Sequence, residues 1–237
     1  MRLVMSAFCA LAFCLVASGA WGDSISIQNA SFEQVAPTNP LASPCNGPGF
    51  CAYNAGNPMP GWTIGGTNAS AGQFEPSSFY FSLPVPDGSI VAYINSGSIS
   101  QTLTGISLLP DSVYTLSVDV GRRFDVGAAN YSLNLLDGSN VFCTSGSNSN
   151  GTITAGTFAD ITLTCSTGAT VPAGLLGIEL TGDGRQVNFD NVQLNVTTST
   201  VSTPEPSALA LTFVGLFVGG LLFLRSRRMQ HLQSASS

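Results

Sequence analysis

The sequence predicts an all-β fold, an antiparallel β-sandwich or jelly roll, over the central part of the chain. Apolar and polar residues alternate strictly over residues 114–120 and again over residues 131–135, which is the period of a strand with one buried face. Turn residues separate such segments. Only 8% of the residues are charged and there is no lysine, so strong helix formers are scarce.

Further strands are expected on both sides of these two segments. They cover residues 24–28, 62–65, 90–95, 98–103, 161–165, 175–180 and 187–196. Turn residues between neighbouring strands are Pro110-Asp111, Asp137-Gly138 and Gly182-Asp183-Gly184. About nine short antiparallel strands are typical of two packed sheets. Residues 39–60 show no alternation and are expected to form a long loop.

Both ends of the chain are expected to be targeting segments around an exported domain over residues 23–196. Arg2 precedes an apolar run over residues 3–16, and small residues follow it, so residues 1–22 are predicted to be a secretory signal peptide, with an uncleaved N-terminal anchor as the alternative. Residues 207–224 carry no charge and would span about 27 Å as a helix, close to the hydrocarbon thickness of a bilayer. One C-terminal transmembrane helix is therefore predicted.

Three arginines end this apolar span and predict its orientation. Arg225, Arg227 and Arg228 are expected to stay in the cytoplasm with a tail over residues 229–237. The domain would then be exported through the inner membrane and lie outside it. Residues 197–203 form a Ser/Thr-rich linker between the domain and the span.

A short motif precedes the span. Pro204, Glu205 and Pro206, then the apolar run, then the arginines give an order over residues 204–228 that resembles the bacterial PEP-CTERM sorting signal. The resemblance implies that an exosortase-type processing enzyme cleaves near the motif and passes the protein to the cell surface or the extracellular matrix. An ordinary single-pass anchor with a Pro-rich stalk is the alternative.

Charge and residue type limit the chemistry of the exported domain. Between Asp23 and Thr203, twelve acidic residues stand against three arginines, which excludes nucleic acid as a partner. The single histidine, His231, lies beyond the span, so His-based and Lys-based catalysis are excluded from the domain. We expect no enzyme. A glycosidase-type carboxylate pair is the open alternative, drawn from Glu33, Glu75, Asp87, Glu179 and Asp183.

Four cysteines remain once the signal peptide is removed, and an oxidising compartment favours disulfides between them. Proximity in sequence favours a pair of Cys45 with Cys51, which would staple the long loop. It likewise favours Cys143 with Cys165, which would join two neighbouring strands. Three pairings are open in principle.

A second, diffuse resemblance covers most of the domain. Residues 29–33, Gly61-Trp62 and residues 188–192 resemble carbohydrate-binding jelly rolls of the galactose-binding-like type. The resemblance implies a structural calcium between Glu33 and Asp190. Independently, the apolar residues of this strand change from odd to even positions after Phe189, as a bulge at Asp190 and Asn191 would require. An Asx turn and a surface glutamate are the alternative.

Sugar sites commonly combine an aromatic platform with polar side chains. The candidate aromatic residues are Trp62, Phe79, Tyr80, Phe81 and Tyr93, with a core position as the alternative for Trp62. Arg122 and Arg123 would face an acidic polymer, or alternatively solvate the end of a strand. We therefore expect a membrane-anchored envelope or matrix protein with a non-catalytic, glycan-binding sandwich. Its expected partners are the processing enzyme, the membrane and extracellular polysaccharide. A small secreted polysaccharide hydrolase and a structural surface protein without ligand are the alternatives.

Overall fold

The computed structural model describes residues 22–45, 48–82 and 84–198, and the regular secondary structure of this part of the chain consists almost wholly of antiparallel strands. The strands are β1 (Asp23–Ile25), β2 (Ser43–Pro44), β3 (Ala52–Tyr53), β4 (Thr63–Glu75), β5 (Val91–Ser107), β6 (Ser112–Arg122), β7 (Asn130–Asp137), β8 (Asn140–Thr144), β9 (Asn148–Ser149), β10 (Thr157–Ser166), β11 (Leu175–Asp183) and β12 (Val187–Thr198). The helical element in this part is one 3-10 turn, η1 (Asn150–Thr152).

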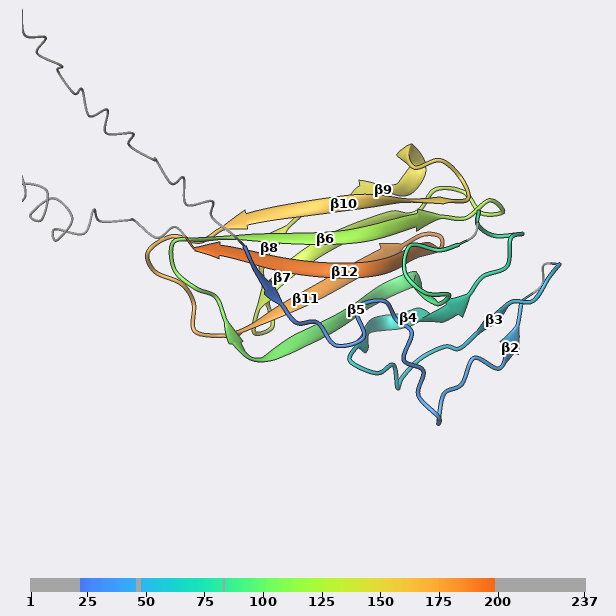
Figure 1. The fold of residues 1–237 in the computed structure, drawn as a ribbon, viewed down its shortest axis with the longest axis horizontal. Coiled ribbons are helices and arrows are strands. Elements are labelled where there is room, and N and C mark those ends of the chain that lie inside the picture. Colours follow the sequence, from blue (N-terminus) through green and yellow to red (C-terminus); the bar gives the residue numbers. More distant parts are fainter. Residues whose placement is uncertain (1–21, 46–47, 83, 199–237) are drawn as a thin grey trace, which may run out of the picture. The chain divides into compact units, whose positions relative to one another are not determined.

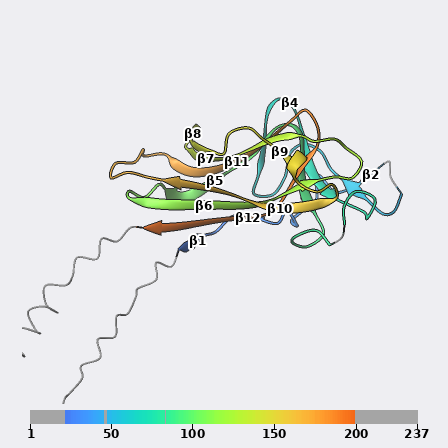
Figure 2. The same ribbon diagram turned by 90° about the horizontal axis from the view of Figure 1, so that it is seen from above.

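The strands form two layers that are joined through β5. The pairing order is β10-β6-β12-β5-β11-β7-β8, with β4 beside β5 and β1 beside the outer part of β12. The first part of β5 pairs with β12, and its second part pairs with β11. One long strand therefore belongs to both layers, which Figures 1 and 2 show from two directions. The predicted β-sandwich is confirmed.

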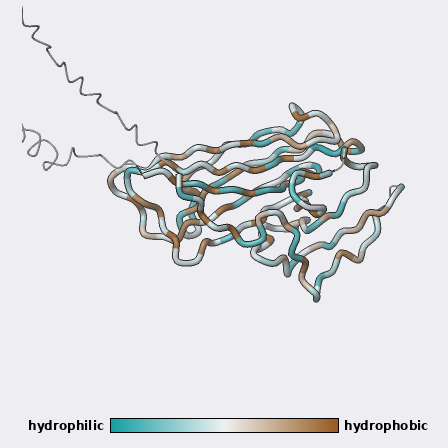
Figure 3. The backbone as a smooth tube through the Cα atoms, viewed as in Figure 1, coloured by the Kyte–Doolittle hydropathy of each residue, from teal (hydrophilic) through white to brown (hydrophobic). Residues whose placement is uncertain are grey.

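The core lies between the layers. Alternate residues of β6 and of β11 enter one buried cluster, among them Leu116, Val118, Ile178 and Leu180. Figure 3 shows hydrophilic and hydrophobic stretches alternating along these strands. Each such aliphatic side chain stabilises the fold by roughly 1.5–3 kcal/mol through burial. The alternation that predicts the strands is thus the alternation that builds the core.

Strand β5 replaces two strands that were expected to be separate. The predicted break falls at Gly97, where the chain bends with a φ of +92° and continues. A Cβ atom at Gly97 would lie 2.5 Å from the carbonyl oxygen of Gly65 on β4, so only glycine allows this close approach. Strand β4 follows the bend and runs to Glu75, well beyond the predicted end at Gly65.

Local turn and bulge predictions hold. Asp137 pairs with Asn140 across the β7–β8 hairpin, as the Asp-Gly signal predicts, although β8 itself was not expected. The register of β12 against β6 shifts between Asp190 and Gln193, which confirms the predicted bulge. The expected loop over residues 39–60 contains the short strands β2 and β3, and β3 pairs with the end of β4.

Both disulfides predicted from proximity are present, with one correction. Cys45 bonds Cys51 at a Cα separation of 5.6 Å, and Cys143 bonds Cys165 at 6.2 Å. The prediction that this disulfide joins two neighbouring strands is wrong. Strands β8 and β10 are not hydrogen-bonded to each other and lie at opposite ends of the pairing order. The second disulfide therefore ties the edge of one layer to the edge of the other.

The targeting predictions fall outside the described residues. These are the signal peptide up to residue 21, the motif Pro204-Glu205-Pro206, the predicted span over residues 207–224 and the arginines Arg225, Arg227 and Arg228. Within residues 22–45, 48–82 and 84–198, no helix has the length and apolar character needed to cross a membrane.

Candidate functional site

A pocket of about 680 Å³ opens on the outer face of the layer that contains β3, β4, the first part of β5, and β12. Along β5, Ala92 and Ile94 point into the main core, while Tyr93 and Asn95 line the pocket. The pocket is lined by Pro44, Cys45, Tyr53, Ala55, Ser70, Phe74, Phe79, Tyr80, Tyr93, Asn95, Arg123, Asp125 and Gln186. We call this the aromatic pocket.

Aromatic rings form one wall of the pocket and pack on each other edge to face. The ring centroids of Phe74 and Tyr80 lie 5.4 Å apart, and those of Phe79 and Tyr80 lie 5.0 Å apart. Tyr53 and Tyr93 form a second T-shaped pair at 6.2 Å. Mutual packing of this kind fixes the ring orientations, so the wall is preformed for a flat apolar ligand.

Tyr93 links the wall to the sheet beneath it. Its hydroxyl donates a hydrogen bond of 2.9 Å to the backbone carbonyl of Asn54. Burial, together with the nearby Tyr53, raises the pKa of Tyr93 to about 12, so the hydroxyl stays protonated at neutral pH. Gly72 leaves room for this ring, because a Cβ atom there would lie 3.0 Å from Cε1 of Tyr93 and 2.2 Å from the Asn54 carbonyl oxygen.

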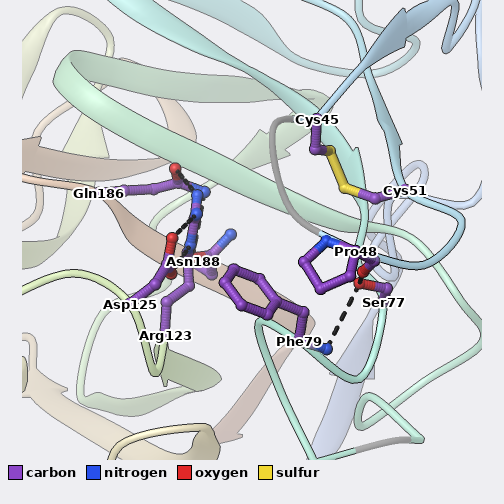
Figure 4. A network of polar contacts seen from close by, with 9 residues as sticks. All are labelled: Cys45, Pro48, Cys51, Ser77, Phe79, Arg123, Asp125, Gln186 and Asn188. Carbon is purple, nitrogen blue, oxygen red and sulfur yellow. Dashed lines mark hydrogen bonds and ion pairs between the residues drawn. A yellow bond between two sulfur atoms is a disulfide. The ribbon is translucent and has the colours of Figure 1, made fainter.

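Arg123 and Asp125 are the charged residues among those that line the pocket. Arg123 donates from Nε to Oδ1 of Asp125 at 2.8 Å and from Nη2 to Oδ2 at 2.6 Å, a bidentate ion pair. Its Nη1 donates to Oε1 of Gln186, and Gln186 donates to Asn188 (Figure 4). The side chains of Asp125 and Gln186 thus fix the guanidinium group of Arg123.

The disulfide-linked loop closes the opposite side of the pocket. Cys45 lines the pocket and Cys51 is buried in the cluster of side chains beneath it. The hydroxyl of Ser77 donates a hydrogen bond of 3.0 Å to the Pro48 carbonyl, which ties this loop to the segment that carries Phe79 (Figure 4). The Cys45–Cys51 disulfide therefore positions one wall of the pocket.

The predicted calcium residues lie at a different place in the fold. Glu33 accepts hydrogen bonds from the backbone amides of Ser89 and Ile90, at 2.8 and 2.6 Å. Asp190, fully buried, accepts from the amides of Asp87 and Asn191 at 3.0 and 2.8 Å. Both carboxylates thus accept hydrogen bonds from backbone amides of residues 87–90. Among the described residues, no three or more His, Cys, Asp or Glu side chains are grouped closely enough to hold a metal ion.

Asp190 carries the most perturbed carboxyl of this region. Burial raises its pKa to about 7, and the neighbouring carboxylates of Asp87 and Asp119 add to the rise. The two backbone hydrogen bonds to Asp190 act in the opposite direction. A buried carboxyl with acidic neighbours costs free energy when it is ionised.

The structure separates the aromatic residues that were predicted as a platform. Phe79, Tyr80 and Tyr93 line the pocket, whereas Phe81 is fully buried beneath it. Trp62 is a core residue whose indole N–H donates to the Asn29 carbonyl at 3.1 Å. Of the predicted arginine pair, Arg123 lines the pocket and Arg122 binds the backbone carbonyls of Gly151 and Ile153.

The carboxylates that were considered for hydrolysis do not meet in the pocket. Among the described residues that line it there is a single carboxyl group, from Asp125, and none from Glu33, Glu75, Asp87, Glu179 or Asp183. Sequence reasoning missed Tyr53, Phe74, Asn95, Asp125 and Gln186. Gln186 and Asp125 lie in loops whose sequence shows no alternation of apolar and polar residues, so nothing in the neighbouring sequence indicates their role. Phe74 lies in the unexpected extension of β4.

These features define the chain as a β-sandwich protein with a preformed aromatic pocket on one sheet. The chain belongs to the HpiC1-like cyclase family, whose model matches residues 23–195. No curated protein matches the chain.

Solved structures of cyclases resemble this fold. One is a cyclase from Fischerella sp. TAU in complex with 4-(1H-indol-3-yl)butan-2-one, at 26% identity and a TM-score of 0.56, covering 75% of this chain and 100% of that chain. Another is the Stig cyclase Fisc from Fischerella sp. TAU in complex with (3Z)-3-(1-methyl-2-pyrrolidinylidene)-3H-indole, at 25% identity and a TM-score of 0.58, covering 75% and 99%.

The expectation that the chain is not an enzyme is wrong. The family it belongs to is a family of cyclases, and similar solved structures are cyclases with small aromatic molecules bound. The error came from equating catalysis with His, Lys or a carboxylate pair. A reaction within one bound molecule can be accelerated largely by holding its reacting ends together.

Proposed function

We propose that the chain is an enzyme that binds a planar, indole-like molecule in the aromatic pocket and closes a ring within it. The observation that carries the proposal is the lining itself, with five aromatic side chains around one cavity of about 680 Å³. Family membership and the indole compounds bound by the Fischerella cyclases support the same ligand class.

The pocket residues have distinct roles in this proposal. The rings of Tyr53 and Phe79, which are more exposed than those of Phe74 and Tyr80, bind the flat ring and stabilise positive charge that develops on it during ring closure. Proton addition at one carbon and proton loss at another would leave an isomer of the substrate. Asp125 supplies the single carboxyl among the lining residues, and we assign proton transfer to it, with Arg123 holding it in place.

Turnover of an indole that carries a flexible alkenyl side chain tests this function. The full-length protein is expected to give a product of unchanged mass with one additional ring, detected by NMR spectroscopy. Asp125→Asn keeps the side-chain shape and is expected to lower the rate about 100-fold or more. Asp183→Asn, on an exposed carboxylate outside the aromatic pocket, is the matched control. Equal rates in all three proteins would remove Asp125 from the reaction.

Binding of an extracellular polysaccharide is the second candidate for the same pocket. Asn95, Ser70 and Gln186 place amide and hydroxyl groups beside the aromatic wall, the combination that sugar sites use. Affinity electrophoresis on a panel of soluble polysaccharides tests it. Retardation that Tyr53→Ala abolishes would support glycan binding. Unchanged mobility on every polysaccharide would exclude the tested polysaccharides as ligands.

We further propose that the chain is exported, anchored by residues 207–224 and processed by an exosortase-type enzyme. The apolar first segment, the Pro204-Glu205-Pro206 motif and the arginines after the span support this proposal. Intact mass in hosts with and without the processing enzyme tests it. Loss of the C-terminal segment only in its presence would support sorting, whereas retention in both hosts would indicate a plain anchor.

We also propose that calcium stabilises the turn between Glu33 and Asp190. The fit rests on oxygen donors and on the cost of ionising the buried Asp190 beside Asp87 and Asp119, which a bound cation would offset. Calcium at millimolar concentration is expected to raise the melting temperature at pH 8, and Asp190→Asn to remove the rise. Equal melting temperatures with calcium and with chelator would exclude the site.

A further inference from the structure

The guanidinium group of Arg123 is fixed against the aromatic wall. Its Cζ atom lies 4.3 Å from the ring centroid of Tyr80 and 5.4 Å from that of Phe74, and the side chain is 13% exposed. Stacking on these rings covers part of its face and gives it a cation–π interaction. Arg123 is therefore a rigid part of the pocket and not a mobile surface side chain.

The hydrogen bonds of Arg123 are only partly used within the protein. A guanidinium group has five N–H groups. Two of them donate to Asp125, from Nε and Nη2, and one donates from Nη1 to Gln186. Within the described part of the chain, one N–H on Nη1 and one on Nη2 have no acceptor, and they remain for a ligand in the pocket that Arg123 lines.

A chain of amides fixes the direction of the Gln186 contact. The Nε2 group of Gln186 donates to Oδ1 of Asn188 at 3.4 Å (Figure 4). Nδ2 of Asn188 donates in turn to the Ala92 carbonyl on β5 at 3.3 Å. Because these donors point away from Arg123, Gln186 presents its oxygen to the guanidinium group. The two remaining N–H groups of Arg123 are thus preorganised donors.

The charges around the pocket select among possible ligand groups. The Asp125 carboxylate already compensates Arg123, and the domain between Asp23 and Thr203 carries twelve acidic residues against three arginines. An anion would have to compete with Asp125 within a negatively charged domain, and an ammonium group would meet the guanidinium donors. A neutral carbonyl accepts hydrogen bonds from them without displacing any protein group.

We infer that Arg123 determines the ligand class of the aromatic pocket: a neutral, planar aromatic molecule with a carbonyl-type acceptor, bound by the two remaining N–H groups. This inference rests on the proposed function of the pocket and adds the chemistry of the group that the ligand must carry. The acceptor orients the ring in the pocket and so decides which part of the molecule faces Asp125.

Binding of four indoles of similar length to the full-length protein tests the inference. They are 4-(1H-indol-3-yl)butan-2-one, its amine analogue, 3-butylindole and 3-(1H-indol-3-yl)propanoic acid, with dissociation constants measured by calorimetry. The ketone is expected to bind on the order of tenfold more tightly than 3-butylindole, and more tightly than the acid or the amine. This comparison needs no variant, so it stands even if a substitution disturbs folding.

Two variants assign the preference to Arg123. Arg123→Met keeps the length of the side chain without its donors and is expected to reduce ketone affinity to that of 3-butylindole. Arg185→Met removes an exposed arginine outside the aromatic pocket and is the matched control, with the preference unchanged. Equal affinity for the ketone and 3-butylindole in the unaltered protein would overturn the inference while leaving an indole pocket. No saturable binding of any of the four would overturn the proposed function and the inference together.

Discussion

Asp190 shows how one buried carboxyl makes stability depend on pH. Its pKa in the folded chain is raised to about 7, whereas the unfolded value is near 4. Between these values the folded chain binds more protons than the unfolded chain, so the free energy of unfolding falls as the pH rises from about 4 to about 7. Burial is the main cause of the raised pKa, and the nearby Asp87 and Asp119 add to it.

The measurement is urea unfolding at pH 5 and pH 8 with a chelator present. The unaltered protein is expected to lose about 3 kcal/mol between the two pH values from this group alone, because the folded pKa of about 7 lies two pH units above pH 5. Asp190→Asn does not titrate and is expected to flatten that part of the profile. A decrease of the same size in the variant would assign the pH dependence to other groups.

Gly72 has a purely steric role, because a larger residue would collide with the backbone of a neighbouring segment. Gly72→Ala would place a methyl group 2.2 Å from the Asn54 carbonyl oxygen, which belongs to backbone and cannot rotate away. We expect a loss of about 2 kcal/mol in the free energy of unfolding, measured with urea. Gly168→Ala, at a position with open space around it, is the control and is expected to change it by less than about 0.5 kcal/mol.

The two disulfides have different roles because they join different elements. Cys45–Cys51 closes a short loop and holds a wall of the aromatic pocket, whereas Cys143–Cys165 ties β8 to β10 across the layers. From loop length, removal would cost roughly 2 kcal/mol for the first and roughly 3 kcal/mol for the second. Removal of Cys143–Cys165 should therefore lower stability more, and removal of Cys45–Cys51 should weaken ligand binding more.

A pair of double Ser variants checks this separation. Cys45→Ser with Cys51→Ser is expected to weaken binding of the indole ketone about tenfold, because the loop wall is no longer held. Cys143→Ser with Cys165→Ser is expected to lower the melting temperature more and to leave the dissociation constant unchanged. If both variants bound the ketone as the unaltered protein does, the loop would have no part in the site.

The whole sandwich is expected to unfold as one unit, since β5 belongs to both layers and the main core draws on both. Leu133→Ala removes a fully buried side chain from that core and should cost about 3 kcal/mol in a single urea transition. Val141→Ala, at a site that is 54% exposed, is the control with little effect. Two separate transitions would mean that the layers unfold independently.

Part of the site was predictable and part was not. Phe79, Tyr80, Tyr93 and Arg123 are recognisable in the sequence as aromatic and cationic candidates, and all four line the pocket. Asp125 and Gln186 are not recognisable, because they follow β6 and precede β12 in irregular segments. They meet only where strands distant in the chain pair, Asn188 of β12 with Gly121 of β6.

Strand faces, turns and the β12 bulge follow from the sequence, because each depends on residues a few positions apart. The disulfide pairs span 6 and 22 positions, and proximity in sequence favoured them. The pairing of β5 with β11 and β12, and the pocket that results, depends on contacts between residues up to about a hundred positions apart. Those contacts are set by packing of the whole core and by a single close approach at Gly97, where a predicted break became a bend. Alternation in the sequence predicts which face of a strand is buried. Which residues pack against that face is decided only when the layers assemble.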